Sequence, residues 1–202
     1  MVDDEGPLSS IVEKERLTAV DDHKKWIEAA KSLGCRTVRV NLHGEGDTDT
    51  RKKVSIDSLS RLGEYAKPLN INVVVENHGS VTSNGAWMAD VMKKVAMENV
   101  GTLPDFGNFC MSDPWGTIQN GCKEMYDPYL GLNELLPFAK GVSAKTYDFN
   151  EKGEQSLIDF KRLIGIVKES GFSGYIGIEY EGTKQSEDEG VKMSKALVQK
   201  YL

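Results

Sequence analysis

Short segments in which apolar and polar residues alternate recur along the chain. In GYIGIEYEG at 174–182, two isoleucines and a tyrosine alternate with a glycine and two glutamates. Segments 38–43, 71–78 and 142–147 show a similar alternation. Because successive residues of a strand point to opposite faces, each segment predicts a strand with one apolar and one polar face. Helical patterns flank these segments, which indicates parallel strands whose apolar faces are covered by helices and whose polar faces look into an enclosed space.

The whole chain reads as a strict alternation of helices and strands. Helices are expected at 15–33, 55–69, 86–99, 127–140, 157–171 and 187–202, and strands at 36–42, 70–76, 100–105, 141–149 and 174–181. We expect a single α/β domain over residues 1–202, since no linker or repeat divides it. The pattern predicts a (β/α)8 barrel that lacks its first three strands, since a full barrel takes about 250 residues. An open, doubly wound sheet of five strands fits the same count.

Composition narrows the class of ligand. The net charge is −6 and basic residues do not cluster, so a nucleic-acid partner is not expected. No apolar run approaches the roughly 18 residues of a membrane span, and the N-terminus lacks the features of a signal peptide. The cysteines Cys35, Cys110 and Cys122 are odd in number and widely spaced, which predicts neither a disulfide framework nor a zinc site. We therefore expect a cytoplasmic protein with a small-molecule ligand.

Carboxylates gather where the expected strands end. Glu76, Asp105, Glu179 and Glu181 lie at the C-terminal ends of three strands, which meet at the mouth of a barrel. Carboxylates crowded there need a cation or protons to offset their repulsion, and oxygen donors suit Mg²⁺ or Mn²⁺. Two glutamates flanking a hydroxy-ketone could also exchange protons at the carbon beside its carbonyl. The alternative is that these residues are ordinary surface charges, solvated or paired with lysine and arginine.

Four motifs carry a family resemblance. The segments VVVENH at 73–78, TLPDFGN at 102–108, AKTYDF at 144–149 and GIEYEG at 177–182 resemble the last four strands of the xylose isomerase-like TIM-barrel superfamily. The resemblance covers essentially the whole chain and implies the C-terminal five-eighths of such a barrel.

Matched motif by motif, the resemblance also implies a site. Glu76 and Glu179 would be metal ligands and the acid/base pair, Asp105 would be a third ligand, and the metal would be Mn²⁺ or Mg²⁺. Family members usually have histidines where this chain has Ser143 and Asn108. Weaker metal binding is therefore expected.

Further residues are candidates for the site. Lys145 points inward by parity and could supply positive charge or polarise a substrate oxygen, unless it only forms an ion pair with Glu179 or Asp148. His23 lies in a helix and is expected at the surface. Arg39 also points inward by parity and is expected to fill the lumen and orient the glutamates. The candidate catalytic residues are Glu76, Glu179 and Lys145, and the candidate substrate-binding residues are Asn41, His43, His78, Trp115 and Glu181.

The first functional hypothesis is a sugar isomerase or epimerase that moves a proton through an enediolate with the help of a metal. The second is a dehydratase or lyase acting on a keto-sugar or inosose, and the third is a non-catalytic, sugar-binding remnant of a barrel. A barrel without three strands has two open sheet edges, so the chain is also expected to aggregate or to form a homo-oligomer.

Overall fold

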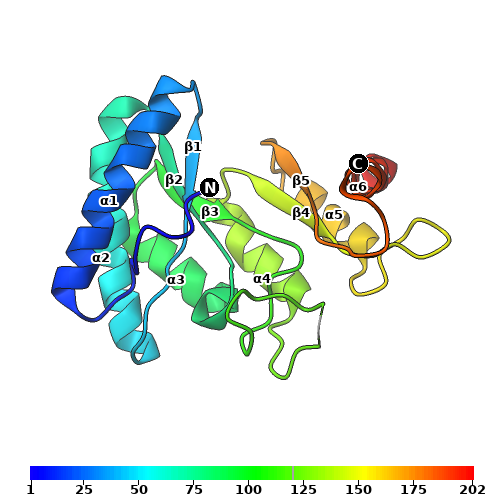
Figure 1. The fold of residues 1–202 in the computed structure, drawn as a ribbon, viewed down its shortest axis with the longest axis horizontal. Helices are drawn as coiled ribbons and strands as arrows, with labels where there is room; N and C mark the ends of the chain where they lie inside the picture. The colour runs from blue at the N-terminus through cyan, green and yellow to red at the C-terminus, as the bar shows by residue number, and fades with distance from the viewer. Residues whose placement is uncertain (120) are drawn as a thin grey trace.

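A computed structural model describes residues 1–119 and 121–202 and shows the expected alternation of helices and strands (Figure 1). Five strands and six α-helices occur where the sequence predicts them, although the helix expected at 55–69 begins seven residues earlier, at Thr48, and the other ends shift by up to five residues. The strands are β1 (Thr37–Val40), β2 (Asn72–Glu76), β3 (Val100–Leu103), β4 (Val142–Thr146) and β5 (Ile176–Tyr180). The helices are α1 (Glu13–Ser32), α2 (Thr48–Ala66), α3 (Gly85–Val95), α4 (Pro128–Leu135), α5 (Phe160–Glu169) and α6 (Glu187–Tyr201), with short 3-10 helices η1 (Lys67–Leu69), η2 (Ser80–Ser83) and η3 (Leu136–Phe138).

The strands are parallel and lie side by side in the order of the chain. β1, β2 and β3 form one sheet and β4 and β5 a second. Isolated bridges from Thr102 to Ala139 and from Asp105 to Ser143 join the two. A doubly wound sheet would reverse its strand order at a switch point, whereas a barrel keeps the order of the chain. The barrel prediction is thereby confirmed over the open-sheet alternative.

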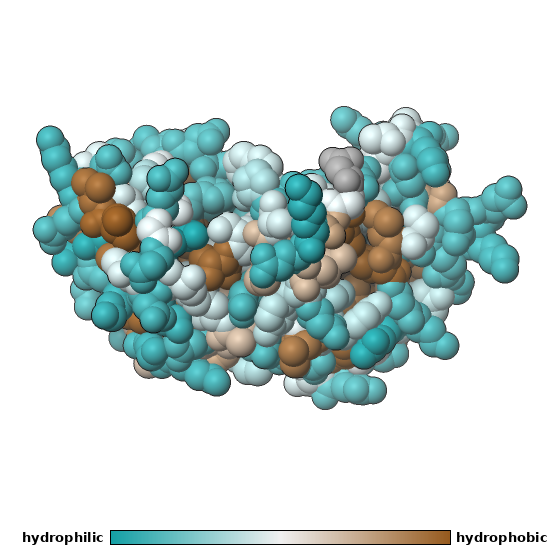
Figure 2. Space-filling model, turned by 90° about the horizontal axis from the view of Figure 1, so that it is seen from below, coloured by the Kyte–Doolittle hydropathy of each residue, from teal (hydrophilic) through white to brown (hydrophobic). Residues whose placement is uncertain are grey.

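The arc of strands is not closed between β1 and β5. β5 pairs with β4 alone among the described strands. Seen from below (Figure 2), the molecule is hollowed on one side, between the half that carries α1 and α2 and the half that carries α6. Residues of all five strands line a cavity on the inner side of the arc, among them Thr37, Glu76, Leu103, Ser143 and Glu179.

The helices cover the outer, apolar faces of the strands. One hydrophobic cluster lies mainly among β1 to β3 and α1 to α3, and a second lies mainly among β4, β5 and α4 to α6. Val73 and Val75 of β2 and Leu163 of α5 are completely buried in these clusters. Most helices begin at a residue whose side chain accepts a hydrogen bond from a backbone N–H of the first turn. These residues are Asp47, Asn84, Asp127, Asp159 and Ser186.

The N-terminal segment, residues 1–12, has no regular structure, yet it is packed against β1. The backbone N–H of Val2 donates to the carbonyl of Arg39 at 3.0 Å, and that of Ser9 donates to the carbonyl of His43 at 2.8 Å. Val2 and Leu8 are buried. This contact brings residues 1–3 to the mouth of the strands.

The expectation that His23 lies at the surface is wrong. His23 is 2% exposed on the inner side of α1, and its Nδ1 lies 2.7 Å from the carbonyl oxygen of Ala19. Burial lowers the pKa of His23. The sequence pattern does not distinguish a buried from an exposed histidine at this position. A neutral imidazole can occupy an apolar position when its N–H is hydrogen-bonded to a carbonyl of its own helix.

The cysteine prediction is also wrong. Cys110 and Cys122 form a disulfide, and Cys35 is free and exposed. The chain around Cys110 folds back on itself, as the antiparallel bridge between Cys110 and Met125 shows, so two distant cysteines meet. The cysteines therefore no longer support the expected cytoplasmic location. None of the described helices is long and apolar enough to cross a membrane.

Candidate active site

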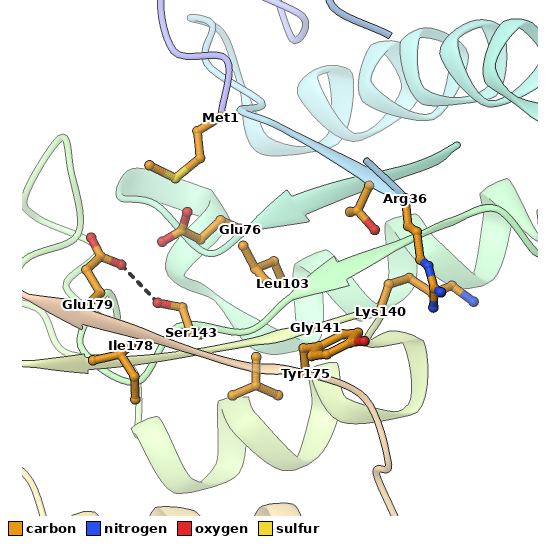
Figure 3. A pocket seen from close by; sticks show the side chains of 13 residues that line it. Met1, Arg36, Glu76, Leu103, Lys140, Gly141, Ser143, Tyr175, Ile178 and Glu179 are labelled. Atoms are coloured by element: carbon orange, nitrogen blue, oxygen red, sulfur yellow. Dashed lines mark hydrogen bonds between the residues drawn. The ribbon is translucent and has the colours of Figure 1, made fainter. Parts of the chain in front are cut away.

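Three carboxylates from separate strands converge at the mouth of the arc. Glu76 ends β2, Asp105 follows β3 and Glu179 lies in β5, and one oxygen from each lies within 4.8 Å of the other two. Glu76 and Asp105 are buried, whereas Glu179 is partly exposed. Figure 3 shows Glu76 and Glu179 at the same end of a cavity. The convergence expected from strand parity is thus observed, including across the joint between β3 and β4.

Two buried cations lie among these carboxylates. The Nε of Arg39 is 3.1 Å from Glu76 Oε2, and the Nζ of Lys145 is 3.3 Å from Glu179 Oε1 and 3.0 Å from Glu181 Oε1. The side chains of Arg39 and Lys145 are 7% and 2% exposed. Lys145 thus forms the ion pair with Glu179 that the sequence analysis considered. Its second partner is Glu181, and Asp148 pairs with Lys184 instead.

Asn108 and Ser143, at the positions where the resemblance implies histidines, contact the carboxylates directly. The Nδ2 of Asn108 donates to Glu76 Oε1 at 3.1 Å, and its Oδ1 accepts a hydrogen bond from Lys145 at 3.2 Å. The hydroxyl of Ser143 donates to Glu179 Oε2 at 2.9 Å (Figure 3). These side chains therefore orient the carboxylates and leave the cluster without a nitrogen ligand of the histidine type.

Burial and mutual repulsion favour protons on the buried carboxylates. Burial and the charge of Asp105 raise the pKa of Glu76, against the opposing effect of Arg39. Burial also raises the pKa of Asp105, against the opposing effect of Lys145. Although burial alone would favour a neutral amine, the charges of Asp105, Glu179 and Glu181 raise the pKa of Lys145. Lys145 is therefore a permanent cation, whereas Glu76 can gain and lose a proton near neutral pH.

The carboxylate cluster fits a divalent cation. Asp105 is completely buried, and its Oδ1 accepts the backbone N–H of Gly107 at 2.8 Å. Its Oδ2 is buried without a hydrogen-bond partner among the described residues. A buried, unpartnered carboxylate oxygen is costly unless a cation or a proton satisfies it. The oxygen donors present are those that Mg²⁺ and Mn²⁺ prefer.

Two residues that the sequence analysis missed hold the site together. The Oδ1 of Asn77 accepts the N–H of Asp105 at 2.7 Å, and its Nδ2 donates to the carbonyls of Asp105 and Asn108 at 3.1 Å. The Oδ1 of Asp3 accepts hydrogen bonds from Arg39 at 2.6 Å and Asn41 at 2.9 Å. Asn77 could have been noticed as a polar residue directly after Glu76, but nothing in the sequence marks Asp3.

Aromatic rings form a separate part of the mouth. His43, His78 and Trp115 pack against one another, with ring centroids 5.5 Å from Trp115 to each histidine and 6.2 Å between the histidines. Burial lowers the pKa of His78 to about 4 and also lowers that of His43. Both imidazoles are therefore neutral at pH 7, and Trp115 remains 51% exposed. The other two candidates for substrate binding face the cations: Asn41 contacts Arg39 at 2.8 Å, and Glu181 contacts Lys145.

A cavity of about 630 Å³ runs along the inner side of the strands. Glu76, Ser143 and Glu179 line one end, and Arg36 and Tyr175 line the other (Figure 3). This volume is within the range of small-molecule sites. The carboxylate cluster therefore borders a space that a small ligand could enter.

The chain is similar to several known proteins over most of its length. The inosose isomerase of Bacillus velezensis is 26% identical over 204 residues, covering 94% of this chain and 71% of that protein. The IOLI protein, whose crystal structure holds a zinc atom, has a TM-score of 0.73 and 19% identity, and covers all of this chain and 76% of its own. A xylose isomerase-like TIM barrel protein from Mycobacterium smegmatis, in complex with magnesium, has a TM-score of 0.70 and 19% identity, covering 95% of this chain and 69% of its own. The last two comparisons show a shared fold.

A family model described as xylose isomerase-like TIM barrel matches residues 4–199, which is nearly the whole chain and confirms the resemblance that the motifs indicated. The protein therefore belongs to the xylose isomerase-like TIM-barrel family.

Proposed function

We propose that this protein is a sugar isomerase or epimerase that moves a proton through an enediolate of a small keto-sugar or related hydroxy-carbonyl compound. The observation that carries the proposal is the meeting of Glu76 and Glu179, from opposite parts of the arc, beside a cavity large enough to admit a sugar. The likeness to an inosose isomerase supports the same reaction class.

The two glutamates have different roles in this reaction. One carboxylate removes a proton from the carbon next to the carbonyl, and the other returns a proton at a neighbouring position or on the opposite face. Burial raises the pKa of Glu76, which makes this carboxylate a good proton acceptor, whereas a bound cation would lower that pKa. Arg39 and Ser143 hold Glu76 and Glu179 in place, and Lys145 offsets their negative charge. The chain thus supplies two proton-transfer groups and the groups that orient them.

We assign Glu76, Asp105 and Glu179 as the ligands of a divalent cation, Mg²⁺ or Mn²⁺. The all-oxygen donor set favours these hard ions over Zn²⁺, which prefers nitrogen and sulfur ligands. When bound, such an ion supplies Lewis-acid polarisation of the substrate carbonyl.

The substrate would be held by polar and aromatic groups around the mouth. Asn41 and Glu181 lie beside the two cations and offer hydrogen bonds to hydroxyl groups. His43 and His78 offer neutral ring nitrogens, and Trp115 offers an exposed ring on which a sugar face can stack.

Solvent-deuterium exchange tests the proposal. With Mg²⁺ or Mn²⁺ present, the purified protein should incorporate deuterium from D2O at a carbon beside the carbonyl in one member of a ketose and inosose panel. Mass spectrometry and NMR would locate the label and identify the product. Removing the metal with a chelator should reduce exchange at least about tenfold, and adding it back should restore it. Binding of sugars with no exchange across the panel would instead indicate a non-catalytic sugar-binding protein.

We also propose that copies of this chain associate along the open edge of the arc. β5 presents a strand edge that no described strand pairs with, and such edges favour pairing with another chain. Size-exclusion chromatography with light scattering is expected to show a dimer or larger species at micromolar concentration. A well-behaved monomer over the whole concentration range would contradict this expectation.

A further inference from the structure

The cavity along the inner side of the strands has two chemically different ends. Glu76 and Glu179 lie at one end. Arg36 and Lys140 line the other end, together with Tyr175 (Figure 3). Among the described residues that line this cavity, the two glutamates are the only acidic ones. The end remote from the carboxylate cluster therefore carries positive charge.

The backbones of these two cations are fixed, whereas their side chains are not engaged. The carbonyl of Arg36 accepts the N–H of Asn72 at 2.9 Å, and the N–H of Lys140 donates to the carbonyl of Thr102 at 3.0 Å. Neither side chain forms a hydrogen bond or an ion pair with any residue that the structure describes. Glu98 borders a neighbouring hollow together with Lys140, but it forms no ion pair with it in the described part of the chain. Both charges are thus available to a ligand.

The buried cations near the carboxylate cluster differ in this respect. Arg39 pairs with two carboxylates at 2.6 and 3.1 Å, and Lys145 pairs with two others at 3.3 and 3.0 Å. An anionic group placed there would have to displace one of these carboxylates, whereas Arg36 and Lys140 have no described partner to displace. The distribution of paired and unpaired cations therefore directs an anion to the remote end.

Small residues keep the space between the two ends open. Gly141, next to β4, and Gly177, in β5, line the cavity. A Cβ atom on Gly101, in β3, would meet the Cγ of Lys140 at 3.0 Å, so this glycine leaves room for the lysine stem. At about 3.3 Å per strand residue, the chain from Lys140 to Ser143 spans roughly 10 Å. An open-chain sugar with an anionic group at its end can bridge such a span.

We propose that the remote end of the cavity is a subsite for a compact anion, the phosphate or carboxylate group at the far end of an open-chain keto-sugar. The guanidinium of Arg36 can bind two oxygens of such a group at once, and Lys140 adds a second point charge. Tyr175, which is 78% exposed, supplies a hydroxyl donor. With the anion held there, the hydroxy-carbonyl end of the sugar lies beside Glu76 and Glu179. This inference rests on the proposed function, since it names the substrate class of the same site.

Isothermal titration of the protein with Mg²⁺ present tests the subsite with three probes that share one carbon skeleton: D-fructose, D-fructose 6-phosphate and D-fructuronate. Wild type should bind the better of the two anionic probes at least about tenfold more tightly than D-fructose, because that probe gains charge-assisted hydrogen bonds. Tighter binding of D-fructose 6-phosphate would assign the subsite to phosphate, and tighter binding of D-fructuronate would assign it to a carboxylate.

Variants of the two cations locate the effect. Arg36→Gln and Lys140→Gln should each reduce the tenfold gain by about threefold, and the double variant should abolish it. Arg36→Lys keeps the charge and should keep most of the gain. Lys31→Gln is the matched control, because Lys31 is an exposed cation in the last turn of α1, outside the cavity, and this variant should bind all three probes like wild type. Circular dichroism would verify folding of each variant.

The outcomes separate the two proposals. The inference is overturned if wild type binds both anionic probes no more tightly than D-fructose, or if the folded double variant keeps the gain. It is also overturned if Lys31→Gln loses as much of the gain as Arg36→Gln, since the attraction would then be a general effect of surface charge. Absence of deuterium exchange in every sugar would overturn the proposed function alone, because binding of the probes is measured without catalysis.

Discussion

Glu76→Gln and Glu179→Gln are each expected to reduce solvent-deuterium exchange by about a thousandfold, since positioned acid/base groups contribute roughly 10² to 10⁴ in rate. Glutamine keeps the size of the side chain and one oxygen, but it cannot carry a proton to or from carbon. In Glu76→Gln the contacts with Arg39 and Asn108 can persist in part, so the fold should survive. Exchange into the ketose, measured by NMR at matched protein concentration, is the readout.

A control removes an acidic group elsewhere. Glu187→Gln alters the exposed first turn of α6, outside the site, and should exchange at the wild-type rate. Because both glutamates are also assigned as metal ligands, metal binding is measured separately for each variant. Exchange within about threefold of wild type in both variants would remove the basis for the proposed function.

Lys145→Met is expected to lower the free energy of unfolding by about 1 to 3 kcal/mol, because it removes a buried cation whose carboxylate partners, Glu179 and Glu181, are partly exposed to solvent. The substitution leaves Glu179 and Glu181 without their shared cation. It also removes the positive charge that offsets the buried Asp105. Chemical denaturation would measure the loss. Lys192→Met, which removes an exposed cation paired with Asp188 on α6, should change stability by about 0.5 kcal/mol or less.

The pH dependence of this loss has a defined sign. The pKa of Glu76 and that of Asp105 are raised in the folded protein, so the folded state binds more protons than the unfolded state above the ordinary carboxyl pKa. Stability from this source is present at low pH and decreases as pH rises through the folded pKa values. The deficit of Lys145→Met should therefore be smaller at pH 5 than at pH 8, and millimolar Mg²⁺ or Mn²⁺ should reduce it at pH 8. A deficit independent of both pH and metal would indicate that Lys145 acts only through packing.

Strand parity predicted much of the site because the side-chain period of a strand is fixed. Glu76, Lys145 and Glu179 each alternate with residues that pack under helices, so their inward direction followed from the sequence alone. Arg39 was expected to face inward for the same reason, and it does contact Glu76. The order of helices and strands predicted the barrel arc in the same way.

Contacts made by irregular segments could not be predicted by this reasoning. Asp3 and Asn77 act through loop geometry, which has no period in the sequence. The meeting of Cys110 and Cys122 depends on how a long segment folds back, and residue spacing carries no information on that path. The hydrogen bond from the backbone N–H of Thr183 to Asp148 likewise joins two loops, through residues that are 35 positions apart in the chain.

The joint between β3 and β4 has a mechanical consequence. The two sheets meet there through isolated bridges instead of a continuous ladder, and Glu76 and Asp105 lie on one side of this joint while Glu179 lies on the other. A ligand bound to all three groups would link the two sheets across the weakest backbone connection in the arc. Occupancy of the site and rigidity of the molecule would then rise together.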